Sequence, residues 1–309
     1  MNPAAGGGHA ADSLPSLQAF AVRNKWSVEF RITQTVQDLR AQALAAAATG
    51  YKRFLVLGGD GSFQDIVNVL APYPEAILGI LPAGGGNDLA DSLGLPHDPL
   101  RAAELLLNGE PEHMDAARVV TSDGKTRLFT GGGGAGVDAQ AAYFASTTFR
   151  RLTGRPRYLL SAARALVEYQ PLQVRLEYRT DDGTTGILES TSMFVAILNT
   201  PSYGAGLRFA PDAVINDGIL NLVVVEDMPV HQLLKALPRL IVQGEVRSPR
   251  VKRFAVRQLS ITTCEPRLFH GDGEVLGYTP LSIEVAPKAF RILCPPGSPL
   301  SSKGDFRSK

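Results

Sequence analysis

The feature that most constrains the fold of this chain is a glycine-rich turn between a short apolar run and an amphipathic segment. Residues 54–57 are all apolar, as in a strand that is buried on both faces of a parallel sheet. Gly58-Gly59-Asp60-Gly61-Ser62 follows, and the next apolar residues recur with the period of a helix, at Phe63, Ile66, Val67 and Leu70. Strand, tight turn and helix in this order predict a parallel α/β layer.

A second glycine-rich turn has the same setting. Residues 77–81 form another apolar run, which is followed by Pro82, Ala83, Gly84, Gly85, Gly86, Asn87 and Asp88. Helices are predicted at residues 38–48, 89–93 and 100–107. Because the carboxyl ends of neighbouring parallel strands meet at one edge of a sheet, we expect the two turns to frame one crevice, where such sheets bind ligands.

Beyond about residue 118 the pattern changes to the alternation of half-buried antiparallel strands. Apolar and polar residues alternate over 172–178, Asp181-Asp182-Gly183 is a hairpin signal, and further strands are predicted at 193–198, 219–225, 259–262 and 281–285. Helices are predicted at 158–169 and 231–243. The sequence thus predicts an α/β domain over 1–117 and an antiparallel β domain over 118–295 whose last strand returns to the first domain. A Pro-, Gly-, Ser- and Lys-rich tail over 296–309 is predicted to be disordered.

Charge and hydropathy exclude two classes of protein. The 309 residues carry a net charge of +1, so no strong positive field points to nucleic acid. No apolar run reaches the roughly 20 residues that span a bilayer, and Met1-Asn2-Pro3 does not begin a secretory signal. The sequence therefore predicts a soluble, cytoplasmic protein, which meets any lipid substrate at the membrane surface.

The first turn suits phosphate binding. Its glycines let the backbone approach a phosphate closely, and the free N–H groups of the following helix favour an anion. The Asp60 carboxylate is favourable near phosphates only beside a cation, while Ser62 and Asp65 resemble a capping box. The pattern is not a P-loop, since no Gly-Lys-Ser/Thr follows. The alternative is a tight structural turn, but two glycines around an aspartate exceed what such a turn needs.

Each of the remaining motifs allows two interpretations. Asn87 and Asp88 suit hydrogen bonds to a ribose, a base or a lipid headgroup, and also suit helix capping. Asp272 and Glu274 flank Gly273, an arrangement that fits general-base catalysis or a turn. Residues 131–138 hold a glycine cluster, and residues 210–218 form an acidic turn that suits a cation or Asx-turn chemistry. Residues 144–158 interleave arginines with aromatics, which fits either an anionic membrane surface or a solvated loop.

Taken together and in order, these motifs resemble the diacylglycerol kinase catalytic-domain family, bacterial lipid kinases related to sphingosine and ceramide kinases. The family pattern has Asn-Pro-x-x-Gly, a Thr, Gly-Gly-Asp-Gly-Thr, Pro-x-Gly-Thr-x-Asn-Asp and a late Asp-Gly-Glu. The matching positions are Asn2 to Gly6, Thr33, Gly58 to Ser62, Pro82 to Asp88 and Asp272 to Glu274. The resemblance runs from residue 1 to about 295, and Gly-Gly-Asp-Gly alone is shared with NAD kinases and phosphofructokinases.

The resemblance implies a set of site residues. ATP would be bound by Asn2, Gly6, Thr33, Gly58, Gly59, Asp60, Gly61, Ser62, Gly84, Gly85, Asn87 and Asp88. Glu274 would be the general base with Asp272 beside it, in a β-sandwich domain that closes the nucleotide cleft. Asp60 would lie near the phosphates and the catalytic Mg²⁺. Asp217 would hold a structural Mg²⁺ with the carbonyl groups of Val214 and Ile219.

The implied activity is transfer of the γ-phosphate of ATP to a lipid hydroxyl, with diacylglycerol as the expected acceptor and phosphatidic acid as the product. Competing hypotheses are another lipid such as phosphatidylglycerol or a sphingoid base, a soluble acceptor such as NAD, and a regulatory protein that binds nucleotide without catalysis. The regulatory hypothesis arises because Gly85 stands where the family has Thr. The resemblance also suggests a homodimer and a strand upstream of Asn2, which would precede Met1.

Overall fold

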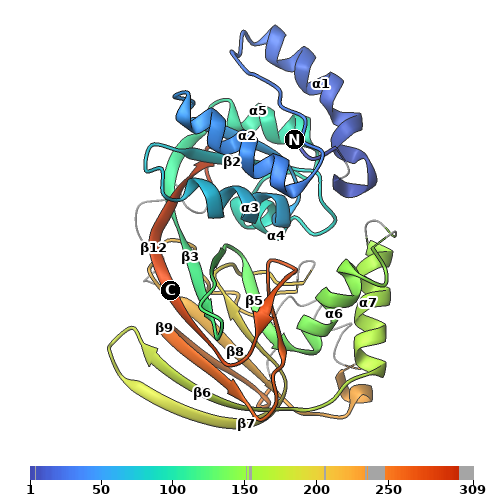
Figure 1. Ribbon diagram of the computed structural model, residues 1–309, viewed down its shortest axis with the longest axis vertical. Helices are drawn as coiled ribbons and strands as arrows, with labels where there is room; N and C mark the ends of the chain where they lie inside the picture. Colours follow the sequence, from blue (N-terminus) through green and yellow to red (C-terminus); the bar gives the residue numbers. More distant parts are fainter. Residues whose placement is uncertain are drawn as a thin grey trace. The chain divides into compact units, whose positions relative to one another are not determined.

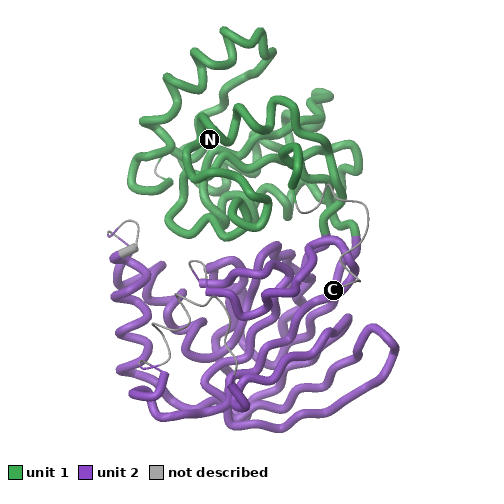
Figure 2. The backbone as a smooth tube through the Cα atoms, turned by 180° about the vertical axis from the view of Figure 1, so that it is seen from behind, with its two compact units in different colours: residues 1–114, 288–309 green, residues 115–287 purple. Residues whose placement is uncertain are grey.

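The computed structural model describes residues 1–3, 5–150, 152, 155–204, 207–233, 235 and 248–298. The chain forms two compact units, Met1–Met114 with Lys288–Lys309 and Asp115–Pro287, which Figure 2 shows in separate colours. The predicted fold class, an α/β layer plus an antiparallel β-sandwich, is confirmed. Most of the predicted helix at 231–243 and of the predicted tail at 296–309 lies outside the described residues.

Unit 1 is built on a parallel sheet. Strand β1 (Arg53–Gly58) pairs with β2 (Ile77–Pro82), and β2 also pairs with the end of β12 (Leu281–Cys294), at Arg291 and Ile292. A 3₁₀ turn, η1 (Ala5–Gly7), precedes five helices, which are α1 (His9–Arg23), α2 (Val36–Ala48), α3 (Asp60–Leu70), α4 (Asp88–Leu93) and α5 (Pro99–Leu106). Because β1 and β2 are parallel neighbours, both glycine turns leave the same edge of the sheet.

Local sequence signals set several of these helix starts. The Thr35 side chain accepts a hydrogen bond from the Asp38 N–H at the start of α2, and Asp98 caps α5 in the same way. The proposed capping box of Ser62 and Asp65 is wrong. Asp65 is buried on α3 and forms an ion pair with Arg40 of α2, which stabilises the contact between these helices.

Unit 2 is an antiparallel β-sandwich, entered through β3 (Glu110–Thr121) and left through β12. Its other strands are β4 (Thr126–Phe129), β5 (Gly132–Gly136), β6 (Leu172–Thr180), β7 (Thr185–Leu198), β8 (Leu220–Glu226), β9 (Val251–Thr263), β10 (Leu268–Gly271) and β11 (Glu274–Tyr278). The long strands β7 and β9 each pair with both β6 and β8 (Figure 1). Their length lets one strand serve both layers of the sandwich.

Two apolar clusters fill the β-sandwich unit. One includes Val195 and Ile197 of β7 with Phe129 and Phe269, and the second gathers Phe194, Ala196 and Leu198 with Phe209 on the other side of β7. This division follows from the period of two in β7, where successive side chains point to opposite faces. Helices α6 (Val137–Ser146) and α7 (Arg155–Val167) pack on each other beside the strands (Figure 1).

Among the described residues, no helix is long and apolar enough to cross a membrane.

Candidate functional site

Three glycine-containing loops meet in unit 1, and together they are called the glycine loops: residues 2–3 with 5–8, residues 58–62 and residues 82–88. A Cβ atom added to Gly84 would lie 2.5 Å from the Gly59 Cα, and one added to Gly6 would lie 2.2 Å from the Ala83 carbonyl oxygen. Such distances are shorter than carbon contacts allow. Gly6 also has a φ of 61°, which favours glycine. The three loops therefore pack backbone against backbone, and side chains at these positions would push them apart.

The Asp60 carboxylate holds two of these loops together. One oxygen, Oδ2, accepts hydrogen bonds from the N–H groups of Asn87 at 2.8 Å and Asp88 at 3.3 Å, while Oδ1 accepts one from the Leu89 N–H at 3.3 Å. Asp60 thus caps α4 from another loop and neutralises the positive end of that helix. Burial raises the pKa of this carboxyl, and the three N–H donors oppose that shift.

Asn87 acts within its own loop. Its side-chain oxygen accepts a hydrogen bond from the Gly84 N–H at 2.9 Å, and its amide nitrogen donates to the Gly84 carbonyl at 3.0 Å. The residue is 4% exposed and has a φ of 65°. Its side chain makes no helix-capping bond, so the capping interpretation of Asn87 is wrong. The Asn87 side chain fixes the shape of the second glycine turn.

The N-terminal residues are ordered by contacts with the other loops. The Asn2 N–H donates to the Leu57 carbonyl at 3.2 Å, and its side-chain amide donates to Ser62 Oγ at 3.4 Å. Thr33 donates both its N–H and its hydroxyl to the Met1 carbonyl, at 3.0 and 2.9 Å. The structure therefore brings Asn2, Ser62 and Thr33 to the same edge of unit 1.

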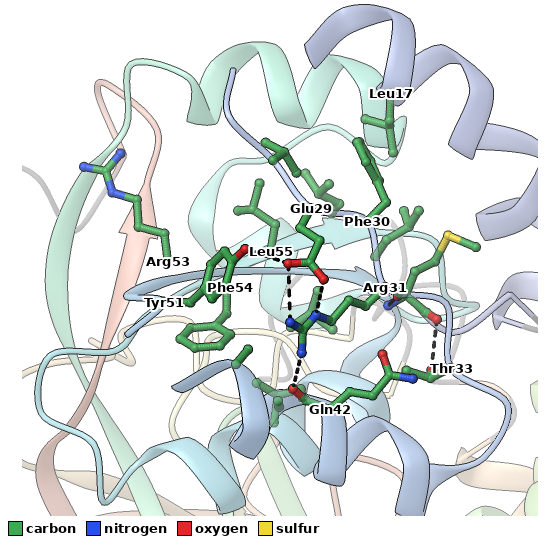
Figure 3. Close-up of a pocket in the computed structure, with 18 of the residues that line it drawn as sticks. Leu17, Glu29, Phe30, Arg31, Thr33, Gln42, Tyr51, Arg53, Phe54 and Leu55 are labelled. Atoms are coloured by element: carbon green, nitrogen blue, oxygen red, sulfur yellow. Dashed lines mark hydrogen bonds and ion pairs between the residues drawn. The ribbon is translucent and has the colours of Figure 1, made fainter. Parts of the chain in front are cut away.

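A cavity of about 250 Å³ runs beside β1 in this unit (Figure 3). Consecutive residues of β1, 53–57, line one side, and the extended segment 26–31 lines the other. At one end Met1 bridges the two sides, because its amine donates to the Arg31 carbonyl while Asn2 is bonded to β1. Arg31 is held by Glu29 at 2.8 Å and by the Gln42 carbonyl at 3.2 Å. A strand upstream of Asn2 stays a prediction.

In unit 2 the Asp272 and Glu274 pair lies on the tight hairpin between β10 and β11, so the turn interpretation is confirmed. The Asp272 carboxylate accepts hydrogen bonds from the N–H and hydroxyl of Thr130 at 2.8 and 3.1 Å, and from the N–H groups of Gly131 and Gly132 at 2.8 and 3.1 Å. Four donors occupy this carboxylate, so Asp272 anchors the hairpin. Glu274 is partly exposed at the start of β11.

The glycine cluster at 131–136 is explained by its place in β5. This strand lies between β7 and β10, and a Cβ atom added to Gly133 would lie 2.4 Å from the His270 carbonyl oxygen. Behind it, the Tyr203 hydroxyl donates to Asp138 Oδ2 at 2.6 Å and lies 2.5 Å from His270 Nε2. All three side chains of this group are largely buried, and they tie α6 to the hairpin strand β10.

The acidic turn of unit 2 brings two carboxylates close together. Asp217 accepts a hydrogen bond from the Ile219 N–H at 3.0 Å, and the buried Asp115 accepts one from the Gly218 N–H at 2.6 Å. Burial raises the pKa of Asp217, and the negative charge of Asp115 raises it further. Within the described part of the chain, no three Asp, Glu, His or Cys side chains gather as metal ligands. The predicted Mg²⁺ ligands include only one side chain, that of Asp217, and the other two are the backbone carbonyls of Val214 and Ile219.

Sequence reasoning missed Thr130 and Asp115. Both are 1% exposed. Thr130 donates a hydrogen bond to Asp272, and Asp115 accepts one from Gly218 in the turn at Asp217. Sequence analysis had singled out Asp272 and that turn. The available signal for Asp115 was a carboxylate between Met114 and Ala116 in β3, because buried polar groups need partners. Thr130 lies in the bend between β4 and β5 and had no such signal.

Comparison with known proteins identifies the family to which the chain belongs. Residues 1–119 match the model of the diacylglycerol kinase catalytic domain, and residues 131–294 match that of the YegS C-terminal NAD kinase beta sandwich-like domain. The chain belongs to the diacylglycerol kinase family, a family of lipid kinases. Membership makes it a phosphotransferase.

Relatives of this lipid kinase match it over most of its length. The diacylglycerol kinase of Mycobacterium tuberculosis is 29% identical over 295 residues, which cover 95% of this chain and 93% of the relative. The probable lipid kinase YegS-like of Chromohalobacter salexigens is 30% identical over 279 residues, covering 88% and 85%. A crystal structure of a diacylglycerol kinase from Bacillus anthracis has a TM-score of 0.69 at 23% identity and covers 96% of this chain and 95% of that one, which supports the fold.

Proposed function

We propose that this lipid kinase transfers the γ-phosphate of ATP to the hydroxyl of diacylglycerol and so makes phosphatidic acid. The observation that carries the choice of lipid is the similarity to a diacylglycerol kinase over 95% of the chain. The glycine loops support the choice of donor, because a partly buried glycine backbone at the N-terminus of helix α3 suits phosphate groups. ATP is also the donor that membership of a kinase family implies.

In the proposed reaction, the lipid hydroxyl oxygen attacks the γ-phosphorus. A new O–P bond forms, the bond from the γ-phosphorus to the β–γ bridging oxygen breaks, and ADP leaves. Glu274 takes the hydroxyl proton. The backbone N–H groups of residues 59–62 bind phosphate oxygens, with Asn2, Gly6, Thr33 and Gly84 to Asp88 forming the rest of the nucleotide site. A bound Mg²⁺ would neutralise phosphate charge, and Asp60 is the carboxylate that would help to hold it.

Two of the proposed acidic residues act chiefly by position. Asp60 joins the loops at 58–62 and 82–88 by accepting hydrogen bonds from three N–H groups, and Asp272 fixes the hairpin that carries Glu274. Each carboxylate is occupied by backbone donors, so its role is to hold its loop or hairpin in shape. The resemblance of Asp272-Gly273-Glu274 to the family motif leads us to assign proton transfer to Glu274.

The assay for this function is transfer from γ-labelled ATP, with Mg²⁺, to lipids in mixed micelles. Labelled phosphatidic acid is expected from the wild type and not from Asp60→Ala, because the variant releases the N-terminus of α4. Label on phosphatidylglycerol or a sphingoid base instead would keep the lipid kinase and reject diacylglycerol. Label only on a soluble acceptor such as NAD would indicate a soluble-substrate kinase, and nucleotide binding without transfer would indicate a regulatory protein.

A structural Mg²⁺ at Asp217 makes a separate prediction. The raised pKa means that the protonated carboxyl is favoured in the fold, so this group contributes stability at low pH that is lost as the pH rises through its folded pKa. At neutral pH a cation would offset the repulsion between Asp217 and Asp115. We expect Mg²⁺ to raise the thermal midpoint of the wild type, and to raise that of Asp217→Asn much less.

Asp212→Asn is the matched control, since Asp212 is an exposed carboxylate of the same turn. Its midpoint should respond to Mg²⁺ as the wild type does. An equal response of Asp217→Asn in differential scanning fluorimetry would reject the Mg²⁺ site.

A further inference from the structure

The glycine cluster of β5 makes room for two polar side chains of unit 2. A Cβ atom added to Gly134 would lie 2.1 Å from Asp138 Oδ2, and one added to Gly132 would lie 2.9 Å from Cδ2 of the Tyr203 ring. Both distances are shorter than van der Waals contacts of carbon. The glycines of this strand therefore leave the space that the Asp138 carboxylate and the Tyr203 ring occupy.

The third member of this group is His270 of β10, which pairs with Gly134 across the two strands. The Tyr203 hydroxyl donates its hydrogen to Asp138, because a carboxylate only accepts. The same hydroxyl oxygen lies 2.5 Å from His270 Nε2 and must accept there, so Nε2 carries a hydrogen. We call Asp138, Tyr203 and His270 the buried hydrogen-bond chain.

The His270 ring is held from one side. It is 5% exposed, and no atom of the described residues forms a hydrogen bond with its Nδ1. Its other nitrogen, Nε2, faces the Tyr203 hydroxyl, and the two rings are stacked with their planes at 22°. Because a buried polar group is costly without a partner, the Tyr203 hydroxyl determines where the His270 ring lies.

His270 lies where the hairpin of β10 and β11 changes register. The pairing shifts between Phe269 and His270, as at a β-bulge, and the next pair, Gly271 with Glu274, closes the hairpin. Bulges next to active sites commonly re-aim a side chain. A slip of the hairpin end by one residue would turn Glu274 to the opposite face of the strand pair. The end of the hairpin therefore depends on side-chain anchors, of which Asp272 is one.

We propose that Tyr203 and His270 are positioning residues for Glu274. The buried hydrogen-bond chain ties β10 to the first turn of α6, where Asp138 lies, while Asp272 ties the turn of the hairpin to β5. The two anchors together set the direction of the Glu274 carboxylate. The inference rests on the proposed function for the role of Glu274 as general base, and it requires no contact of Tyr203 or His270 with the lipid.

Tyr203→Phe removes only the hydroxyl that joins the other two residues. It should lower kcat for lipid phosphorylation at least about tenfold, because a small misplacement of a reacting group is costly in rate. The KM for ATP should stay unchanged, since the glycine loops belong to unit 1. Tyr278→Phe is the matched control, at a 55% exposed tyrosine of β11, and should keep the wild-type kcat.

A double-mutant cycle separates positioning from a loss of folded protein. If the buried hydrogen-bond chain acts through Glu274, then Tyr203→Phe should lower kcat at most about twofold when Glu274→Gln is already present, because residues that act as a unit are not additive. A loss of folded protein, or a role independent of Glu274, would lower kcat by the same factor in both backgrounds. That result would overturn the proposal.

Two substitutions of His270 test the hydrogen bond itself. The amide nitrogen of glutamine is the same number of bonds from Cβ as histidine Nε2, so His270→Gln keeps a donor for Tyr203. It should retain kcat within about threefold, whereas His270→Leu, which has no donor, should lose about as much as Tyr203→Phe. Equal kcat values of the two His270 variants would reject the hydrogen bond as the positioning contact.

Amide hydrogen exchange gives a readout that needs no substrate. Exchange in residues 271–276 of the full chain should be at least about tenfold faster in Tyr203→Phe than in the wild type, with rates in β6 unchanged. If the wild type phosphorylates no lipid, or Glu274→Gln keeps its turnover, the proposed function fails, and the exchange rates still decide whether the chain holds the hairpin. Wild-type exchange in the hairpin of Tyr203→Phe would overturn the proposal.

Discussion

Glu274→Gln is expected to lower kcat for lipid phosphorylation by about 10²–10⁴, since the amide cannot accept the hydroxyl proton. The substitution keeps the shape of the side chain and removes only the carboxylate. Steady-state kinetics with γ-labelled ATP measure the effect, and the thermal midpoint should stay close to that of the wild type. Near-wild-type turnover would remove Glu274 from the role of base.

Asp272→Ala is the informative comparison, because it lies two residues away and has a different expected effect. Its carboxylate accepts three backbone N–H bonds and one hydroxyl bond, from Thr130, Gly131 and Gly132. Removing it leaves those donors without an acceptor and should cost at least about 2 kcal/mol of unfolding free energy. Activity should fall together with stability. A variant that lost activity at full stability would make Asp272 a direct participant in catalysis.

Gly84→Ala is expected to abolish phosphate transfer from ATP, because it would force the glycine loops apart. The added methyl group would lie 2.5 Å from the Gly59 Cα and 2.8 Å from Asn87 Oδ1. Neither neighbour can move easily. The Gly59 Cα is a backbone atom, and the Asn87 side chain is hydrogen-bonded to both the N–H and the carbonyl of Gly84. The loops must separate, and we expect the affinity for ATP, measured by isothermal titration calorimetry, to fall at least about tenfold.

The control for this prediction is Gly124→Ala. Gly124 has a φ of 76° and nothing within 4 Å of an added Cβ atom, so the substitution costs about 1 kcal/mol of backbone strain without a clash. It should lower the thermal midpoint slightly and leave ATP affinity unchanged. Full ATP affinity in Gly84→Ala would show that the loops tolerate separation.

Local patterns predicted most of the regular structure. The continuous apolar runs became β1 and β2, the alternation at 172–178 became β6, and the Ala- and Leu-rich stretch became α2. These elements are specified by periodicity within a few residues, which is the information that a single sequence carries best. Helix α1 was missed because Pro15 and the preceding glycines weaken its local signal, although a contact with α5 stabilises it.

The candidate site, like the fold, was predicted from the sequence only in part. The sequence by itself singled out the candidate residues, since the glycine turns, Asp60 and the Asp272 to Glu274 hairpin stand out as short motifs. Their assignment to ATP, lipid and Mg²⁺ stays a prediction. Only the tertiary structure decided that Asp60 caps α4, that Asp65 pairs with Arg40 and that Asp272 binds Thr130 and the glycines of β5. The two residues of each pair are 25 to 142 positions apart in the sequence. A hydrogen bond or ion pair across such a separation produces no periodic sequence pattern.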